Sequence, residues 1–405
     1  MTYRAVLANR EFAAILVSQT LSTAGDQLAR IAVAILVYQR SGSALAASAT
    51  YAVSFLVYLA GGPLLAAISD RRPRVGVMVF CDVARAPLVL GLALGEPPLW
   101  EVFALLAVVG MLAPPFDSAR SALQPDILSG DAYVKGNAIM SVMLQSAQVL
   151  GFAVGGAVVA WTSAKGALFL DAGTFLVSAG FVLALIQSRP AALEASERTS
   201  LLSETLSGLR FVSHHPELRT LLGYALLGSA AIIVPEGLAV PVADDLGHGA
   251  VAAGLLTGSV PLGFLLGSTY ILRLQPERRR EILPAVAAIG PIPLLAMPLV
   301  HRLDVMLILW TVAGVGGTVN LIASAAYMQT CPREFRARAY GLAITSLNAV
   351  QGGFLILGGL VAGLTTPRLS VAILSLVTLA FLLAARMLRS GQDATSEIAD
   401  SGRET

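Results

Sequence analysis

The chain has 405 residues, of which 56% are hydrophobic and only 13% are charged, and its mean hydropathy is +0.75. Soluble proteins carry about a quarter charged residues, so this composition excludes most soluble enzymes, and its hydrophobicity excludes a disordered chain. The net charge of +2, without a basic stripe, gives no reason to expect a nucleic-acid partner. The composition therefore predicts an integral membrane protein, with the lipid bilayer as its surroundings.

Apolar runs bounded by charged residues, glycine or proline divide the chain into twelve candidate membrane spans. A spanning helix needs about 20 residues, and only helices or closed barrels satisfy the backbone in lipid. The short alternating segments of a barrel are absent from this sequence, so an all-α integral membrane protein is predicted. The expected spans are 12–38, 44–68, 75–95, 99–120, 134–162, 166–187, 219–243, 250–273, 282–300, 304–329, 337–364 and 369–389.

The distribution of basic residues predicts the topology. With the N-terminus in the cytoplasm, cytoplasmic segments carry 21 of the 27 Lys and Arg residues and the opposite segments carry four. The remaining two, Arg30 and Arg85, fall inside spans. This asymmetry follows the positive-inside rule, and an odd number of spans would mix the two sets. Both termini are therefore expected in the cytoplasm.

The order of spans and loops predicts two halves. Residues 1–187 form an N-terminal six-helix half, 188–218 a cytoplasmic linker, 219–389 a C-terminal six-helix half and 390–405 a disordered cytoplasmic tail. Apolar residues recur at helical spacing over 201–211 and favour an amphipathic helix in the linker, a flexible linker with some helix being the alternative. Gln148 with Gly155-Gly156 and Gln351 with Gly358-Gly359 repeat at the same offset of 203 residues, as expected for two parallel repeats around a cavity.

The segment between the second and third spans carries a recognisable motif. Gly62 is followed by Asp70-Arg71 and then by Arg72 and Arg74, which resembles the loop signature of the major facilitator superfamily. Pro73 stands where that signature commonly has glycine. The resemblance implies the major facilitator fold, in which twelve transmembrane helices form two six-helix halves around a central cavity.

Further residues resemble a bacterial twelve-span exporter branch, which includes enterobactin-exporter-like and macrolide-efflux-like carriers. They are Gly25-Asp26, Ser41-Gly42-Ser43, Asp82, Arg85, Asp171-Ala172, Thr174-Phe175 and Gly208-Leu209-Arg210-Phe211. The resemblance covers about residues 9–389 and implies the inner (cytoplasmic) membrane of a bacterial cell. One departure weakens antiport: span five has Gly151-Phe152 where antiporters of the superfamily often have Gly-Pro.

Ionisable residues within spans are costly and commonly functional. Asp26 and Arg30 share one face of span one, and Asp26 lies roughly 21 Å along the helix from Phe12. We interpret Asp26, with Arg30, as a site for a proton or a cationic substrate, the alternative being a permanent ion pair that fixes helix packing. Glu236, after Pro235, and Asp171 are further candidates for proton coupling or substrate binding, each with a purely structural alternative.

A second group of charges predicts a gate. Asp82 and Arg85 share a face of span three near the loop motif. The gating candidates are Gly62, Asp70, Arg71, Arg74, Asp82 and Arg85, with Asp117 and Arg120 as possible partners. In the family this loop is thought to clamp the outward-facing state. Helix capping by Asp70, favoured by the helix dipole, is the alternative.

Small and polar residues predict helix contacts and the cavity wall. Close helix contacts are expected at Gly151, Gly155, Gly156, Gly358 and Gly359, between spans five and eight and between spans eleven and two. Gly263 and Gly267 offer a matching pair in span eight, and static packing is the alternative to movement there. The polar residues expected to face the cavity are Gln27, Gln145, Gln148, Asn320, Asn348 and Gln351.

Together these features predict a secondary active transporter, which exports an amphipathic small molecule such as a drug, an antibiotic or a siderophore-like natural product. Protons would drive the export, and the protein would act as a monomer. The sequence has no Walker A motif, no Ser-His pair in the spans and no metal-ligand spacing, so no enzyme activity, cofactor or metal is expected. A facilitator or importer of a small metabolite, and a carrier-like receptor that does not transport, remain alternatives.

Overall fold

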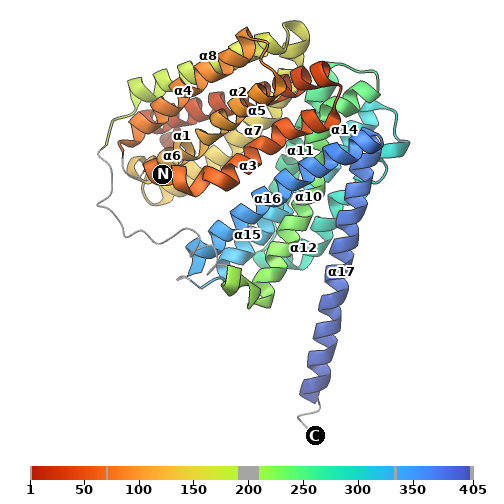
Figure 1. Cartoon of the computed structure of the whole chain (residues 1–405). Coiled ribbons are helices and arrows are strands. Elements are labelled where there is room, and N and C mark those ends of the chain that lie inside the picture. The colour runs from red at the N-terminus through yellow and green to blue at the C-terminus, as the bar shows by residue number, and fades with distance from the viewer. Residues whose placement is uncertain (1, 70–71, 190–208, 333–334, 402–405) are drawn as a thin grey trace.

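The computed structural model describes residues 2–69, 72–189, 209–332 and 335–401, with side chains except those of 60–69, 337–338 and 388–401. This described part is helical and contains no strand, which confirms the all-α prediction. Figure 1 shows two bundles of helices, one formed by the first part of the chain and one by the second.

The N-terminal half begins with a short helix, α1 (Tyr3–Leu7). Its longer helices are α2 (Arg10–Ser41), α3 (Ala44–Ser69), α4 (Arg74–Leu94), α5 (Leu99–Met111), α6 (Ala113–Ile127), α7 (Asp131–Trp161) and α8 (Ala164–Leu185). The Asn9 side chain caps α2 by accepting a hydrogen bond from the Phe12 amide at 3.0 Å. Gly42 ends the helix with φ of 61°, a left-handed conformation that favours glycine.

The C-terminal half starts after a short helical stretch at 209–213. Its elements are α10 (Pro216–Asp245), α11 (Ala250–Ile271), α12 (Pro276–Ile289), α13 (Pro291–Leu294), the 3-10 helix η1 (Met297–Leu299), α14 (Leu303–Gly316), α15 (Val319–Thr330), α16 (Arg336–Leu364) and α17 (Pro367–Ser401). Most of the amphipathic linker helix expected at 201–211 lies outside the described residues.

Among the residues that the structure describes, eleven helical segments are long and apolar enough to cross a membrane. In addition, α3 contains a shorter apolar stretch, Ala44–Leu59, and coincides with the second predicted span. Three spans are not continuous helices. The fourth breaks between α5 and α6, next to Pro114 and Pro115, and the ninth breaks at Pro291. Proline removes a backbone donor and clashes with the preceding turn. The tenth breaks at Gly317 between α14 and α15.

The last helix is longer than predicted. The spans end at 389 by hydropathy, whereas α17 continues to Ser401, across most of the expected disordered tail. Residues 390–401 contain no proline. A helix that has already formed in the preceding span can therefore extend into them, because each further residue that becomes ordered adds one hydrogen bond.

The apolar core shows how the two halves meet. We call the ends where α2 begins and where α8 leads into the linker the linker side, and the opposite ends the far side. One buried cluster contains far-side residues from both halves, such as Ile35, Ala44, Val240 and Ala362. On the linker side, each half has its own separate cluster. The halves are therefore joined at the far side and parted at the linker side, as the diverging bundles of Figure 1 show.

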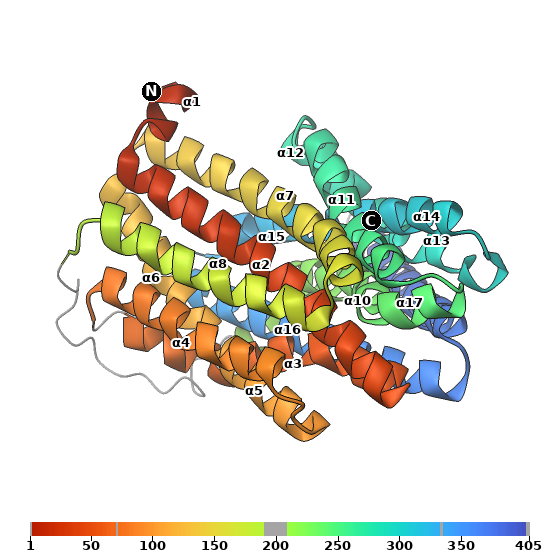
Figure 2. The same ribbon diagram turned by 90° about the horizontal axis from the view of Figure 1, so that it is seen from above.

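Two helix pairs make the joint between the halves: α3 packs against α16, and α7 packs against α11. Within the N-terminal half α2 packs against both α7 and α8, and Figure 2 shows α2 running between them. Within the C-terminal half α10 packs against α16 and α17 in the same manner. The pairs that are equivalent under the sequence repeat thus occupy equivalent places.

Candidate functional site

A cavity of about 200 Å³ lies between the two halves. Its N-terminal wall comes from α7 and its C-terminal wall from α10, α11, α14–α15 and α16. The lining combines six apolar side chains, six polar ones and two glycines. It consists of Gln145, Gln148, Phe152, Ser229, Ile232, Ile233, Glu236, Val260, Pro261, Phe264, Gly314, Gly317, Asn320 and Gln351.

The structure places four of the six polar candidates on this wall: Gln145, Gln148, Asn320 and Gln351. Gln27 is elsewhere: its side chain is buried where α2 packs against α7, and its Oε1 has no hydrogen-bond partner among the described residues. Asn348 also lies outside the lining, and its Nδ2 donates to the carbonyl of Ile344 at 2.8 Å within α16.

Glu236 is the carboxylate of the cavity wall. It makes no hydrogen bond or ion pair with the residues that the structure describes. The cation whose charge acts on Glu236 is Arg30 of α2, in the opposite half. Two prolines, Pro235 and Pro241, lie inside the same helix and remove backbone donors near this position. Glu236 is therefore free to bind a group that enters the cavity.

A separate cluster of charges is buried within the N-terminal half. Asp82 and Arg85 of α4 are almost fully buried and lie 3.8 Å apart. Ser178 Oγ of α8 donates to Asp82 Oδ2 at 2.6 Å. Because Ser178 uses its single proton there, Ser18 Oγ is the donor in the 2.6 Å bond between the two serines. This chain of hydrogen bonds joins α2, α8 and α4.

Arg85 is the central cation of this cluster. Its guanidinium lies over the rings of Phe116 and Phe175, at 5.5 and 5.4 Å from their centroids. Its charge acts on Asp82, Asp26, Asp171 and Asp117. One buried arginine therefore acts on four carboxylates that belong to four different helices.

The structure corrects the predicted grouping of these charges. Asp26 and Arg30 share a helix face but form no ion pair within 4.0 Å, and Arg85 acts on Asp26 more strongly than Arg30 does. Asp171 accepts a hydrogen bond from Thr174 Oγ1 at 3.4 Å, beside Gly25. Asp82 and Arg85, predicted to form a gate with the loop charges, lie with Asp26 and Asp171, and the charge of Arg85 also acts on the gating candidate Asp117. Asp70 and Arg71, the other predicted members of the gate, lie outside the described residues. Helical spacing identifies neighbours on one helix but not the cation that another helix contributes.

The loop motif is described only in part. Asp70 and Arg71 lie outside the described residues, and Gly62 belongs to α3, where the surroundings are not described. Arg74 forms an ion pair with Asp126 and donates to the carbonyl of Ala122 at 2.8 Å, both in α6. Asp117 and Arg120 pair with each other at 3.7 Å. Asp126, which follows Pro125 beyond the predicted end of the fourth span, was not among the predicted partners.

Some of the predicted contact glycines pack against the other half, and others pack within their own half. A Cβ on Gly156 would lie 2.5 Å from the Ala250 carbonyl oxygen of α11, and one on Gly359 would lie 2.6 Å from the Leu45 Cα of α3. These two glycines therefore contact the other half. By contrast, Gly151 and Gly155 face α2, and Gly358 faces Val234 of α10, within their own halves.

The predicted match between span five and Gly263 with Gly267 is wrong. Gly263 packs against Thr311 and Gly314, and Gly267 packs against Val315 and Thr318. The residue that meets Gly156 is Gly254, nine positions earlier than Gly263. At 3.6 residues per turn, nine positions place two residues on opposite faces of a helix.

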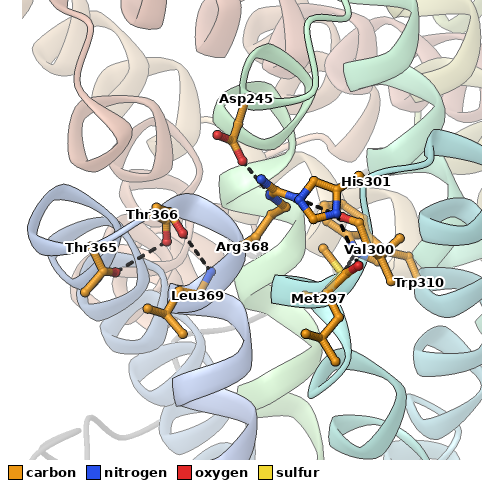
Figure 3. A network of polar contacts seen from close by, with 10 residues as sticks. Asp245, Met297, Val300, His301, Trp310, Thr365, Thr366, Arg368 and Leu369 are labelled. Carbon is orange, nitrogen blue, oxygen red and sulfur yellow. Dashed lines mark hydrogen bonds and ion pairs between the residues drawn. The ribbon is translucent and has the colours of Figure 1, made fainter.

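Polar contacts strengthen the far-side joint. Tyr38 Oη donates to Asp244 Oδ2 at 3.2 Å, and Ser48 Oγ donates to the Leu355 carbonyl at 2.6 Å. Both bonds cross between the halves. Next to them Arg368 Nε donates to Asp245 at 2.5 Å, and its Nη1 donates to the Val300 carbonyl at 2.9 Å (Figure 3). Tyr38, Asp244, Asp245, Val300 and Arg368 lie at or next to the predicted ends of spans, whereas Ser48 and Leu355 lie inside them.

Two six-helix halves around a central cavity are the arrangement that the loop motif implied. Comparison with known proteins identifies the family. The model of the Major Facilitator Superfamily matches residues 15–302. The chain belongs to this superfamily. It is a multi-pass membrane protein of the major facilitator fold.

Several transporters of the superfamily are similar to this chain. An uncharacterized MFS-type transporter of Bacillus subtilis, YvqJ, is 28% identical over 52% of each chain. The multidrug efflux pump Tap of Mycolicibacterium fortuitum is 26% identical over 59% of this chain and 61% of its own length. The matched region thus spans only about half to three fifths of these relatives.

Other similarities extend further along the chain. The lysophospholipid transporter LplT of Photorhabdus laumondii is 24% identical over 87% of this chain and 88% of its own length. Among solved structures, the D323A mutant of the nucleoside transporter NupG superposes with a TM-score of 0.76, covering 93% of this chain and 99% of that one. The NupG identity of 12% supports the fold alone.

Proposed function

We propose that this major facilitator protein is a secondary active exporter of an amphipathic small molecule and that the entry of protons drives the export. The observation that carries the proposal is the wall of the central cavity. It combines apolar side chains with neutral polar ones and has one carboxylate, Glu236, without a partner among the described residues. Such a mixed wall suits a substrate that has both an apolar part and a few polar groups better than a small anion.

Two relatives support this substrate class. Tap is a multidrug efflux pump and LplT is a lysophospholipid transporter. A lysophospholipid is itself an amphipathic molecule. These names describe the relatives, and they favour a drug, an antibiotic or a siderophore-like natural product over a sugar for this chain.

The proposed orientation puts both termini and the linker side in the cytoplasm of a bacterial cell, in its inner membrane, as the 21-to-4 distribution of basic residues favours. The structure then corresponds to an inward-open state, because the shared core lies at the far side. Rocking of the halves about the α3–α16 and α7–α11 contacts would close the linker side and open the far side.

Proton coupling is assigned to Glu236 and Asp26. Glu236 lines the cavity, where a proton and a substrate can compete for it. Asp26 lies among the charges around Arg85, so a change in its protonation alters the balance that holds α2 against α8 and α4. Asp171 belongs to the same cluster and is a second acid in it.

The test begins with a substrate panel in a pump-deficient bacterial host, using drugs, siderophores and natural products. For any compound whose resistance rises, uptake is measured in everted membrane vesicles with an imposed proton gradient. We expect accumulation inside the vesicles and its loss on adding a protonophore. A facilitator would equilibrate the compound without a gradient, and a non-transporting receptor would bind it without flux.

The coupling residues are tested in the same vesicles. Asp26→Asn and Glu236→Gln are expected to abolish accumulation driven by the gradient, while the protein remains inserted in the membrane. If either variant transports normally across the pH range, that residue does not couple protons. Asn320→Asp adds a carboxylate to the same wall and serves as a control for altered cavity charge.

A further inference from the structure

A second cavity, of about 180 Å³, lies on the linker side of the first. It is enclosed by α10, α15 and α16 of the C-terminal half, and its wall is almost entirely apolar. The side chains that form most of this wall are Leu222, Ala225, Leu226, Tyr327, Ala343 and Leu347. Asn320 belongs to the walls of both cavities, so the two spaces are adjacent.

One face of each helix runs from the apolar cavity into the polar one. On α10, Leu222, Ala225 and Leu226 are followed at helical spacing by Ser229 and then by Glu236. On α16, Ala343 and Leu347 are followed in the same way by Gln351. The result is a continuous surface that is apolar at the linker side and polar toward the membrane centre.

The junction between the two cavities is fixed by hydrogen bonds. Asn320 Nδ2 donates to Ser229 Oγ at 2.7 Å, and Ser229 Oγ donates to the Ala225 carbonyl at 2.6 Å. The polar groups at the junction therefore satisfy one another, and no charged side chain lies in the wall of the apolar cavity. Along α10, Leu226 and Glu236 are separated by roughly 15 Å at 1.5 Å per residue.

We propose that the apolar cavity between α10, α15 and α16 binds the hydrocarbon tail of a single-chain amphiphile, whose cationic head lies at Glu236 in the adjacent cavity. The charge of the head follows from the unpartnered carboxylate, and the single extended tail follows from the continuous apolar face that leads away from it. The inference rests on the proposed function in taking the central cavity as the substrate site, and it adds the chemical class of the substrate.

Tail length and head charge can be varied independently in a binding experiment. The probes are hexyl-, decyl- and tetradecyltrimethylammonium, with tetradecyl sulfate as the anionic counterpart. Binding is measured to the full chain in phosphatidylcholine nanodiscs, without a proton gradient, after subtraction of binding to empty nanodiscs. The affinity is expected to rise by about fourfold for each methylene that enters the apolar cavity.

Two variants separate the tail site from the head site. Ala343→Phe fills the apolar cavity and is expected to lower the affinity for the tetradecyl probe by about tenfold or more, with the hexyl probe little affected. Glu236→Gln is expected to lower the affinity for all three ammonium probes by about tenfold and to keep the dependence on tail length. Leu357→Phe, at an exposed position of α16 outside both cavities, is the matched control and should change neither.

Three results would overturn the inference: the same dependence on tail length in Ala343→Phe as in the natural chain, equal losses in Leu357→Phe, or tighter binding of tetradecyl sulfate than of the ammonium probe. Leu222→Asn, which keeps the size of the side chain and makes the wall polar, repeats the test if Ala343→Phe does not fold. Because no gradient is used, a failure of proton-driven export in vesicles leaves these binding results intact, and the two failures are distinguishable.

Discussion

Tyr38 of α2 donates a hydrogen bond to Asp244 of α10 at 3.2 Å, and this contact crosses between the two halves at the far side. Both side chains belong to the joint that any opening of the far side must break. Their bond therefore contributes to the stability of this conformation and not to the stability of either half alone.

Removal of this bond should shift the conformational equilibrium. Tyr38→Phe keeps the ring and deletes the donor, and a partly exposed hydrogen bond of this kind is worth about 0.5–1 kcal/mol. We expect the population with an open far side to rise by about twofold to fivefold. Spin labels at Trp161 and Leu364, which are exposed at the far side of each half, would report it as a longer distance.

Tyr270→Phe provides the control for the tyrosine substitution. Tyr270 is exposed at the linker-side end of α11, so the same chemical change there should leave the distance distribution unaltered. An unchanged distribution in Tyr38→Phe would show that the bond to Asp244 does not bias the joint.

The contact between Gly156 and Gly254 makes a stronger prediction. Gly156→Ala would place a Cβ 2.5 Å from the Ala250 carbonyl oxygen and 2.8 Å from the Gly254 Cα. Both are backbone atoms, so α7 and α11 must move apart, and the far side can no longer close as it does here. We expect at least a tenfold loss of transport, together with a population shifted toward an open far side.

Gly180→Ala is the matched control, since nothing lies within 4 Å of its added Cβ. The alanine should slightly stabilise α8, because alanine has the higher helix propensity. Full transport by Gly156→Ala would contradict a moving joint at this contact and favour a loosely packed one.

The sequence predicts most of the fold, because each span is set by local hydropathy and the topology by the distribution of Lys and Arg. It also places Gln148 and Gln351 on one cavity, since their repeat puts them on equivalent helices. What it cannot supply is the neighbour that another helix contributes. Asp126 as the partner of Arg74 is such a case.

The glycines illustrate the same limit. Gly155 and Gly156 are adjacent in sequence, yet one faces α2 and the other faces α11. A residue in a helix turns by about 100° from its neighbour, so a Gly-Gly pair predicts close packing without identifying the partner. The choice of Gly263 in place of Gly254 failed for this reason, since either residue fits a pattern of small side chains.

The cluster around Arg85 predicts a large effect on stability. Arg85→Met would leave Asp82, Asp26 and Asp171 without their central cation, and removal of one partner from a buried pair typically costs about 3–5 kcal/mol. We expect a marked fall in the temperature of unfolding in detergent. The double variant Arg85→Met with Asp82→Asn should recover part of the loss, because it also removes one of the unpaired charges.

Arg120→Met is the comparison for that experiment. Arg120 pairs at 3.7 Å with Asp117, whose side chain is 42% exposed, so its loss should cost much less. Equal effects of the Arg85 and Arg120 variants would contradict the central role of Arg85. Transport by the variants is measured separately, since a fold that survives need not couple protons.

The last prediction compares the contributions of two far-side arginines, Arg368 and Arg302, to the stability of the protein. Arg368 joins three parts of the C-terminal half, because its Nε donates to Asp245 of α10 and its Nη1 donates to the Val300 carbonyl after η1 (Figure 3). Its side chain is only 15% exposed. Arg302 lies nearby in sequence to Val300 and pairs with Asp304, but both side chains are mainly exposed.

Arg368→Ala should therefore destabilise the protein by about 2 kcal/mol, the scale of a hydrogen bond between charged groups. Arg302→Ala should have no measurable effect, because an exposed ion pair contributes little. Thermal unfolding of both variants in the same detergent compares them directly. If both variants lost the same stability, the Arg368 hydrogen bonds would contribute no more than an exposed ion pair does. Apolar packing alone would then hold α17 to α10.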